Sequence, residues 1–231
     1  DSGRIGIGPA PSNPIRCSDT LLEMCVEFVD RYGVGVHCHL LETEVQTRIA
    51  QDLYGTTTVR HLDDLGLLTS NLSCAHTIWI DDADIELMAD RGASVVHNPE
   101  SNLLSASGLA PIATMLARGL NVGLGSDGSC SSGDQAIHRA MKLATAIHRN
   151  GEPDRARWVS TRQALTMATA GGAAAMFAKG KFGALAIGQA ADVVLYDLTC
   201  PWWTPVNNPI YQFVQSETGA GVDTVIVAGQ V

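Results

Sequence analysis

The sequence predicts an α/β protein built on a parallel β-sheet, and three observations carry this prediction. Short apolar segments alternate with segments of helical periodicity about four times before Phe182. The strand segments are apolar throughout, as is typical of strands covered on both faces. Glycine is frequent, with 23 of 231 residues, which suits tight connections between strands and helices. Half of a (β/α)8 barrel and an open doubly wound sheet both fit this pattern.

The first helix has the clearest boundaries. Ser18 is a suitable N-cap, apolar residues recur at helical spacing over residues 19–32, and Gly33 stands at the C′ position. Strands are expected at residues 4–8, 35–39, 72–76, 93–97 and 121–125, where Pro9 and Pro99 end the first and the fourth. Further helices are expected at residues 42–53, 59–65, 81–91, 112–118, 135–149 and 161–179.

The pattern changes after Phe182. The segments GALAIGQAADVVLYDL and VDTVIVAGQV alternate apolar and polar residues between glycine turns, which is typical of antiparallel strands. We therefore predict two parts, the α/β part over residues 1–181 and a small β-domain over residues 182–231.

Composition excludes several classes of protein. The formal net charge of −9 argues against nucleic-acid binding, which needs a basic surface. No apolar run reaches the ~18 to 20 residues of a membrane span, and no signal peptide is visible. The six cysteines form no CxxC pair. We expect reduced thiols in a cytoplasmic protein that binds neither nucleic acid nor membranes and forms a homo-oligomer.

Polar residues gather where the predicted strands end. His37, His39 and Glu42 follow the second strand and His76 ends the third. The fourth strand ends in His97 and Asn98, and the fifth is followed by Asp127. Chemistry in barrels lies at these strand ends, and histidine nitrogen with carboxylate oxygen suits Zn²⁺ or Fe²⁺. Each residue also has a plainer interpretation, since Glu42 suits a helix N-terminus and Asp127 a turn before Gly128.

The motifs HLLET, CAHT, HNPESNLLSASGLAP and GLGSDG occur in this order. Together they resemble the amidohydrolase superfamily, in the branch of cytosine, guanine, 8-oxoguanine and S-adenosylhomocysteine deaminases and triazine hydrolases. The segment GALAIGQAADVVLYDL resembles that family's return to its β-sandwich. The resemblance implies a partial (β/α)8 TIM-type barrel, strands 4 to 8, with a small β-sandwich second domain.

The resemblance also implies roles for individual residues. His39 and Asp127 match metal ligands, and Glu42 matches the acid/base that moves protons between water and the ring. His76 matches the histidine that orients the water or the substrate, and Asp127 also accepts the water's proton. The HNPESN motif matches a segment that shapes the pocket, so the expected substrate-binding residues are His97, Asn98 and Asn102.

One departure from the family pattern concerns an HxH motif on the first barrel strand, which supplies two more metal ligands. The only HxH here is His37-Cys38-His39, and the HLLET context assigns His39 to strand 5. We therefore expect strands 1 to 3 to lie outside this chain, and His37 to face away from His39 toward the helices. The chain opens without Met and ends inside a strand pattern, as expected of a fragment.

The function implied is a metal-dependent hydrolytic deaminase of a purine, pyrimidine or triazine-type heterocycle, with one divalent metal, Zn²⁺ first and Fe²⁺ second. An alternative within enzymes is removal of chloride or an alkylamine from a triazine on the same scaffold. An alternative from another class is a domain that keeps the barrel without catalysis. With two metal ligands missing, we expect this chain alone to bind metal weakly and to be inactive.

Overall fold

The computed structural model describes residues 5–150 and 152–231. Its internal contacts divide the chain into two compact units. The first unit comprises Asp1–His97, Ala106–Val122 and Ala175–Phe177, and the second comprises Asn98–Ser105, Gly123–Ala174 and Ala178–Val231. The two units are not separated at a single point of the sequence, because the later segments Ala106–Val122 and Ala175–Phe177 belong to the first unit.

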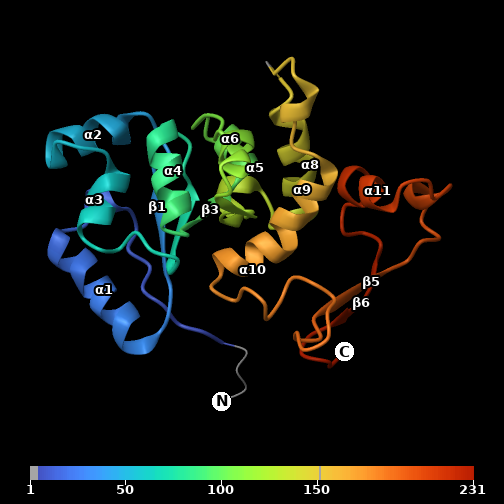
Figure 1. Cartoon of the computed structure of the whole chain (residues 1–231). Coiled ribbons are helices and arrows are strands. Elements are labelled where there is room, and N and C mark those ends of the chain that lie inside the picture. The colour runs from blue at the N-terminus through green and yellow to red at the C-terminus, as the bar shows by residue number, and fades with distance from the viewer. Residues whose placement is uncertain (1–4, 151) are drawn as a thin grey trace. The chain divides into compact units, whose positions relative to one another are not determined.

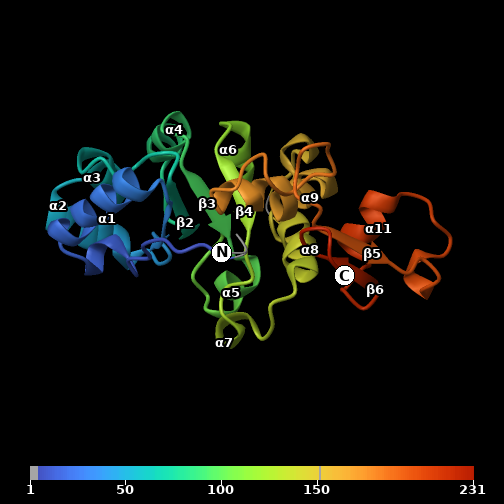
Figure 2. The ribbon, with the colours of Figure 1, turned by 90° about the horizontal axis from the view of Figure 1, so that it is seen from below.

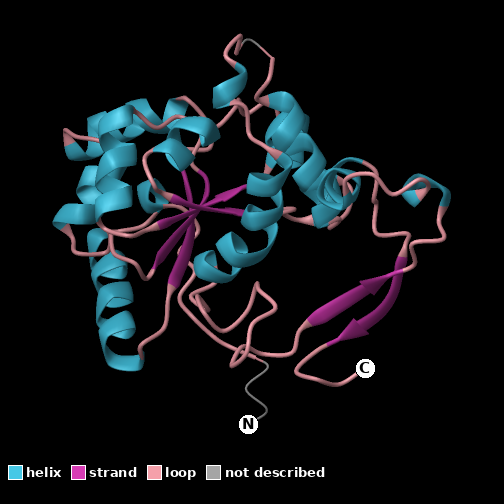
Figure 3. Ribbon diagram, turned by 45° about the vertical axis from the view of Figure 1, so that its right-hand side comes forward, coloured by secondary structure: helices cyan, strands magenta, loops and turns pink. Residues whose placement is uncertain are grey.

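The first unit contains a parallel sheet, which confirms the α/β class. The strands are ordered β1 (Val36–Leu40), β2 (Leu72–His76), β3 (Ser94–His97) and β4 (Asn121–Leu124), of which β4 begins in this unit. β1 pairs in parallel with β2, and β2 with β3. Figure 1 labels β1 and β3, Figure 2 labels β2, β3 and β4, and Figure 3 shows the strands in magenta with helices alongside.

The strand predicted at residues 4–8 is wrong for residues 5–8, which form no strand, and Arg4 lies outside the described residues. The segment that contacts β1 contains Pro9 and Ser12, slightly later in the sequence than the predicted strand. His37 N donates to Pro9 O at 3.2 Å and His39 N donates to Ser12 O at 3.0 Å. Pro9 and Pro11 have no N–H to return, so this contact does not develop into a regular strand ladder.

Helix α1 (Asp19–Tyr32) has the predicted ends. The Ser18 hydroxyl accepts from Leu21 N at 3.2 Å, and Gly33 adopts φ 63°, the left-handed conformation that favours glycine. The other helices of this unit are α2 (Val45–Tyr54), α3 (Thr58–Asp64), α4 (Asp82–Asp90) and α6 (Ile112–Ala117). Figure 2 shows α1, α2 and α3 gathered together.

A late residue completes the packing before β1. Phe177 belongs to the first unit, and a Cβ added at Gly35 would lie 2.1 Å from the Phe177 ring. Glycine is therefore required at position 35 for this ring to pack against the backbone.

The second unit is mainly helical. Its helices are α5 (Pro99–Leu104), α7 (Ser129–Ser132), α8 (Ile137–Ile147), α9 (Thr161–Thr166) and α11 (Pro209–Gln215). Pro99 was expected to end a strand, and it also begins α5, since proline suits the first turn of a helix. The helix predicted at 161–179 is interrupted by a π-helical segment, Met167–Gly171, before α10 (Gly172–Ala175).

The antiparallel pattern predicted after Phe182 is confirmed by β5 (Val193–Tyr196) and β6 (Val222–Ile226), which form a two-stranded antiparallel sheet (Figure 3). Helix α11 lies between them in the sequence and was not predicted. None of the helices in the described part of the chain has the length and apolar character needed to cross a membrane.

Candidate functional site

The segments at the ends of β1, β2 and β4 adopt an unusual backbone conformation. Leu41 after β1 has φ 47°, and His76 and Thr77 at the end of β2 have φ 69° and 49°. Asp127, after β4, has φ 62°. Non-glycine residues rarely adopt positive φ, and strained positions of this kind concentrate at functional sites. The backbone thus marks the strand ends that the sequence singles out.

His39 lies on the exposed face of β1. Its Nδ1 lies 2.5 Å from the backbone oxygen of Ser12. Because a carbonyl oxygen only accepts, Nδ1 carries the hydrogen, and the lone pair of the neutral ring is on Nε2. Histidines that bind metals usually donate their other ring N–H to a carbonyl or a carboxylate in this way. The chemistry of His39 therefore fits a metal ligand.

His76 is buried at 1% exposure and its ring stacks on that of His39, with centroids 5.5 Å apart and an interplanar angle of 14°. The turn that follows is held to the neighbouring strand, since Thr77 N donates to Leu40 O at 2.8 Å. The structure thus brings together two of the predicted site residues that are well separated in the sequence.

The prediction that His37 faces away from His39 is wrong. Both side chains are exposed on one face of β1, while Val36, Cys38 and Leu40 are buried on the other. Residues two apart in a strand point to the same face. The Nδ1 of His37 lies 3.1 Å from Ser73 Oγ. Burial, His39 and His76 each lower the pKa of His37, which favours the neutral imidazole.

Glu42 is half-buried on the loop after β1, and its backbone is held by a residue that the sequence analysis missed. The buried Gln46 side chain accepts from Glu42 N at 3.0 Å and from Asn13 Nδ2 at 3.3 Å, through the same oxygen Oε1. This bond, with the strained Leu41, delays the predicted helix until Val45. The role of Gln46 depends on this burial and on the contact with Asn13, neither of which the sequence shows.

Asp127 lies in the second unit, and both oxygens of its carboxylate have donors. The Ser101 hydroxyl donates to Oδ2 at 2.5 Å, and Gly128 N donates to Oδ1 at 2.6 Å. Hydrogen bonds of this kind favour the charged carboxylate. Ser101 belongs to the HNPESN motif, but the sequence analysis had not singled it out.

The three residues expected to bind substrate are buried. His97, which ends β3, is 0% exposed. Asn98, the N-cap of α5, is 4% exposed, and Asn102, on α5, is 2% exposed. Between the two asparagines, Glu100 pairs with Arg139 at 2.8 Å. Contact between these residues and substrate stays a prediction.

Metal binding needs ligands that converge. Within residues 5–150 and 152–231, no three histidine, cysteine, aspartate or glutamate side chains are grouped so that they could hold a metal ion. His39 thus has the donor chemistry of a ligand, but the described residues contain no three-residue ligand group.

Comparison with known proteins identifies the family. The amidohydrolase family profile matches residues 1–231.

The chain belongs to the amidohydrolase family.

Among curated members of this family, the chain is 38% identical over 229 residues to a 5-methylthioadenosine/S-adenosylhomocysteine deaminase of Caldanaerobacter subterraneus subsp. tengcongensis. The match covers 99% of this chain and 53% of that protein. The chain therefore spans about half the length of the curated amidohydrolases it matches.

Two solved structures are similar in fold to this chain. An adenosine deaminase from Xanthomonas campestris, with bound zinc, gives a TM-score of 0.95 at 30% identity and matches 100% of this chain and 52% of its own. An atrazine chlorohydrolase from Arthrobacter aurescens, in complex with zinc, gives 0.91 at 28% identity, over 96% of this chain and 49% of its own. The resemblance to the deaminase and triazine hydrolase branch is thereby confirmed.

Proposed function

We propose that the complete protein is a metal-dependent hydrolytic deaminase that releases ammonia from an adenine nucleoside. The observation that carries this proposal is the arrangement of His39, whose Nε2 lone pair is left available beside the stacked ring of His76. Relatives named as deaminases of adenosine and its thioether derivatives support the choice of substrate. We further propose that residues 1–181 are the C-terminal part of the barrel, with β1 to β4 as its strands 5 to 8, and that residues 182–231 belong to a β-sandwich.

His39 and Asp127 would hold the divalent metal, for which the zinc of the solved relatives makes Zn²⁺ the first choice. Such a metal would lower the pKa of a bound water toward ~7 and so supply a nucleophile at neutral pH. The hydrogen bond from His39 Nδ1 to Ser12 fixes the ring so that Nε2 is the nitrogen that binds.

The protein's own residues would handle the protons. Glu42 protonates the ring nitrogen of the heterocycle, and Asp127 takes a proton from the attacking water. The ring of His76 is fixed by burial and by stacking on His39, and it stabilises the negative charge that develops on the oxygen bonded to the attacked carbon. His97, Asn98 and Asn102 would shape the pocket for the heterocycle.

The test is ammonia release by zinc-loaded protein expressed from the complete reading frame. Adenosine, 5-methylthioadenosine and S-adenosylhomocysteine are the substrates, and atrazine is the comparison. We expect ammonia from at least one nucleoside. Chloride from atrazine with no ammonia from the nucleosides would instead support the alternative function, which the atrazine chlorohydrolase relative favours. The absence of both products would contradict the proposal.

The 231-residue chain by itself is expected to bind zinc weakly and to have no deaminase activity. Catalytic zinc normally has three protein ligands, and the proposed assignment provides two, His39 and Asp127. Metal analysis of the purified chain, with the ammonia assay, checks this. Stoichiometric zinc and turnover in this chain would contradict the assignment. If His37→Ala then removed the zinc, His37 and His39 would be the HxH ligands, since they share one face of β1.

Gln46 is proposed as a positioning residue for Glu42. Gln46→Leu removes the oxygen that accepts from Glu42 N and Asn13 Nδ2, so we expect kcat of the complete protein to fall roughly tenfold with little change in KM. Gln46→Glu keeps an acceptor oxygen and should retain more of kcat. Equal loss of kcat in both variants, or unchanged kcat in Gln46→Leu, would argue against this role.

A further inference from the structure

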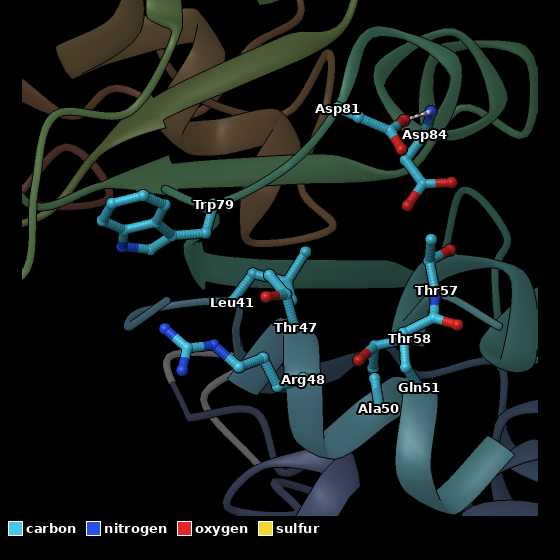
Figure 4. Close-up of a pocket in the computed structure, with 10 residues that line it drawn as sticks. All are labelled: Leu41, Thr47, Arg48, Ala50, Gln51, Thr57, Thr58, Trp79, Asp81 and Asp84. Atoms are coloured by element: carbon cyan, nitrogen blue, oxygen red, sulfur yellow. Dashed lines mark hydrogen bonds between the residues drawn. The ribbon is translucent and has the colours of Figure 1, made fainter. Parts of the chain in front are cut away.

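The first unit contains a pocket of about 300 Å³ lined by residues of α2, α3 and α4 and by the loops after β1 and β2 (Figure 4). Apolar side chains of Leu41, Ala50 and Trp79 line part of it. Thr58 and Asp84 contribute polar groups. This volume lies at the lower end of the range for small-molecule sites, roughly 300 to 1,000 Å³.

Two oxygen atoms of residues that line the pocket are buried without a hydrogen-bond partner in the described part of the chain. They are Oγ1 of Thr58 and Oδ1 of Asp84, and both residues are 1% exposed. The nearest cation to Asp84 Oδ1 is Arg60, whose Nε lies 3.6 Å away, too far for a hydrogen bond. Leaving buried polar atoms unsatisfied is unfavourable, and a hydrogen-bond donor on a ligand would offset that cost.

The charges around these atoms favour a cation. Asp81 also lines the pocket, and it accepts from Asp84 N at 2.8 Å, as the dashed line in Figure 4 shows. Arg48, which lines the other end, is paired with Glu44 at 3.2 Å. Two carboxylates thus face the pocket, with Arg60 as the partial counter-charge.

The pKa of Asp84 depends on the same surrounding groups. Burial raises the pKa of Asp84 and the nearby Asp81 raises it further, whereas the polar group of Thr57 and the charge of Arg60 lower it. A cation with N–H donors in the pocket would stabilise the charged carboxylate.

We propose that this pocket binds a small primary amine in its ammonium form. The nitrogen donates to Asp84 Oδ1 and Thr58 Oγ1, and an apolar body of the amine packs against Leu41, Ala50 and Trp79. A bare metal ion fits less well, because much of the pocket wall is apolar and no group of three ligating side chains is present among the described residues. This site is independent of the proposed deamination, since none of its residues has a role there.

The experiment is calorimetric titration of the 231-residue chain with benzylamine, benzyl alcohol and benzoate at neutral pH. The three probes share a ring and differ in the polar group. We expect saturable one-to-one binding of benzylamine, at least tenfold weaker binding of the alcohol, and none of benzoate. His39→Ala should leave the benzylamine affinity unchanged, which separates this site from the proposed catalytic residues.

Two variants and a matched control locate the binding. Asp84→Asn and Thr58→Val should each weaken benzylamine binding about tenfold, whereas Asp82→Asn, whose side chain is 75% exposed on the same helix, should not. Thr58→Val removes a hydroxyl that has no hydrogen-bond partner among the described residues, so the melting temperature of this variant should stay unchanged or rise. If Asp84→Asn does not fold, Thr58→Val alone tests the proposal. Equal affinity for amine and alcohol, unchanged affinity in Thr58→Val, or no saturable heat would overturn the proposal.

Discussion

Replacement of His39 by alanine is expected to lower ammonia release by the complete protein roughly a thousandfold or more, because the metal loses a ligand whose ring is fixed by its hydrogen bond to the Ser12 carbonyl. Asp127→Ala should have an effect of the same size, since it removes both a ligand and a proton acceptor. Zinc content, measured on the same samples, should fall in both variants.

The matched control is His61→Ala. His61 lies on α3, where its Nε2 is 2.9 Å from Asp19 and its ring stacks on Tyr54. It has no role in the proposed chemistry, so more than half of the activity should remain. If His39→Ala kept both zinc and turnover, the assignment of His39 as a ligand would be wrong.

The largest effect on stability is expected at Glu217, in the second unit. Its carboxylate is 3% exposed and accepts hydrogen bonds from five N–H groups, those of Trp202 Nε1, Trp203 Nε1, Thr218 N, Gly219 N and Gly221 N. In Glu217→Gln, the new amide group cannot accept as many donors, so buried N–H groups lose their partner. We expect a loss of about 3 to 5 kcal/mol in the free energy of unfolding, by analogy with broken buried charged pairs.

Denaturant unfolding of Glu217→Gln, with Asp223→Asn on the exposed part of β6 as control, measures this loss. The control should change stability by less than about 0.5 kcal/mol. A loss of under 1 kcal/mol in Glu217→Gln would contradict the prediction.

The carboxylate of Glu217 should also make the free energy of unfolding depend on pH. Burial raises the pKa of Glu217, but the hydrogen bonds from Trp202, Gly221, Trp203 and Gly219 outweigh it and lower the pKa from 4.5 to about 2. Because the folded pKa is depressed, the stabilisation is complete above pH 4.5 and is lost as pH falls toward 2. The wild-type chain should therefore lose more stability over this range than Glu217→Gln does.

Much of the fold could be predicted from local patterns. The apolar run of β2 and the capped helix α1 were placed correctly to the residue, because burial and capping are local signals. The strand at 4–8 was not, since a short apolar stretch before Pro9 does not reveal which backbone it will contact. Helix α11 was missed because its capping Asn208 and Pro209 follow a proline-rich loop without helical periodicity.

The site shows the same limit. His39, His76 and Asp127 stood out because polar residues at buried strand ends are unusual. Their supports did not, because the Ser12 carbonyl is a backbone group that every residue has. Gln46 was likewise hidden, since its role depends on Asn13 being brought close in space. The orientation of His37 needed only the two-residue period of a strand, which was applied wrongly.

The course of the chain through the two units has a consequence for biosynthesis. The backbone crosses from one unit to the other after His97, Ser105, Val122, Ala174 and Phe177. On the ribosome, strand β1 emerges early, but the ring that packs on Gly35 is translated much later. A nascent chain that stops before Phe177 therefore exposes the Gly35 backbone that this ring covers. Truncation, proteolytic cutting and circular permutation of this protein should accordingly be planned around Phe177 and not around a single linker.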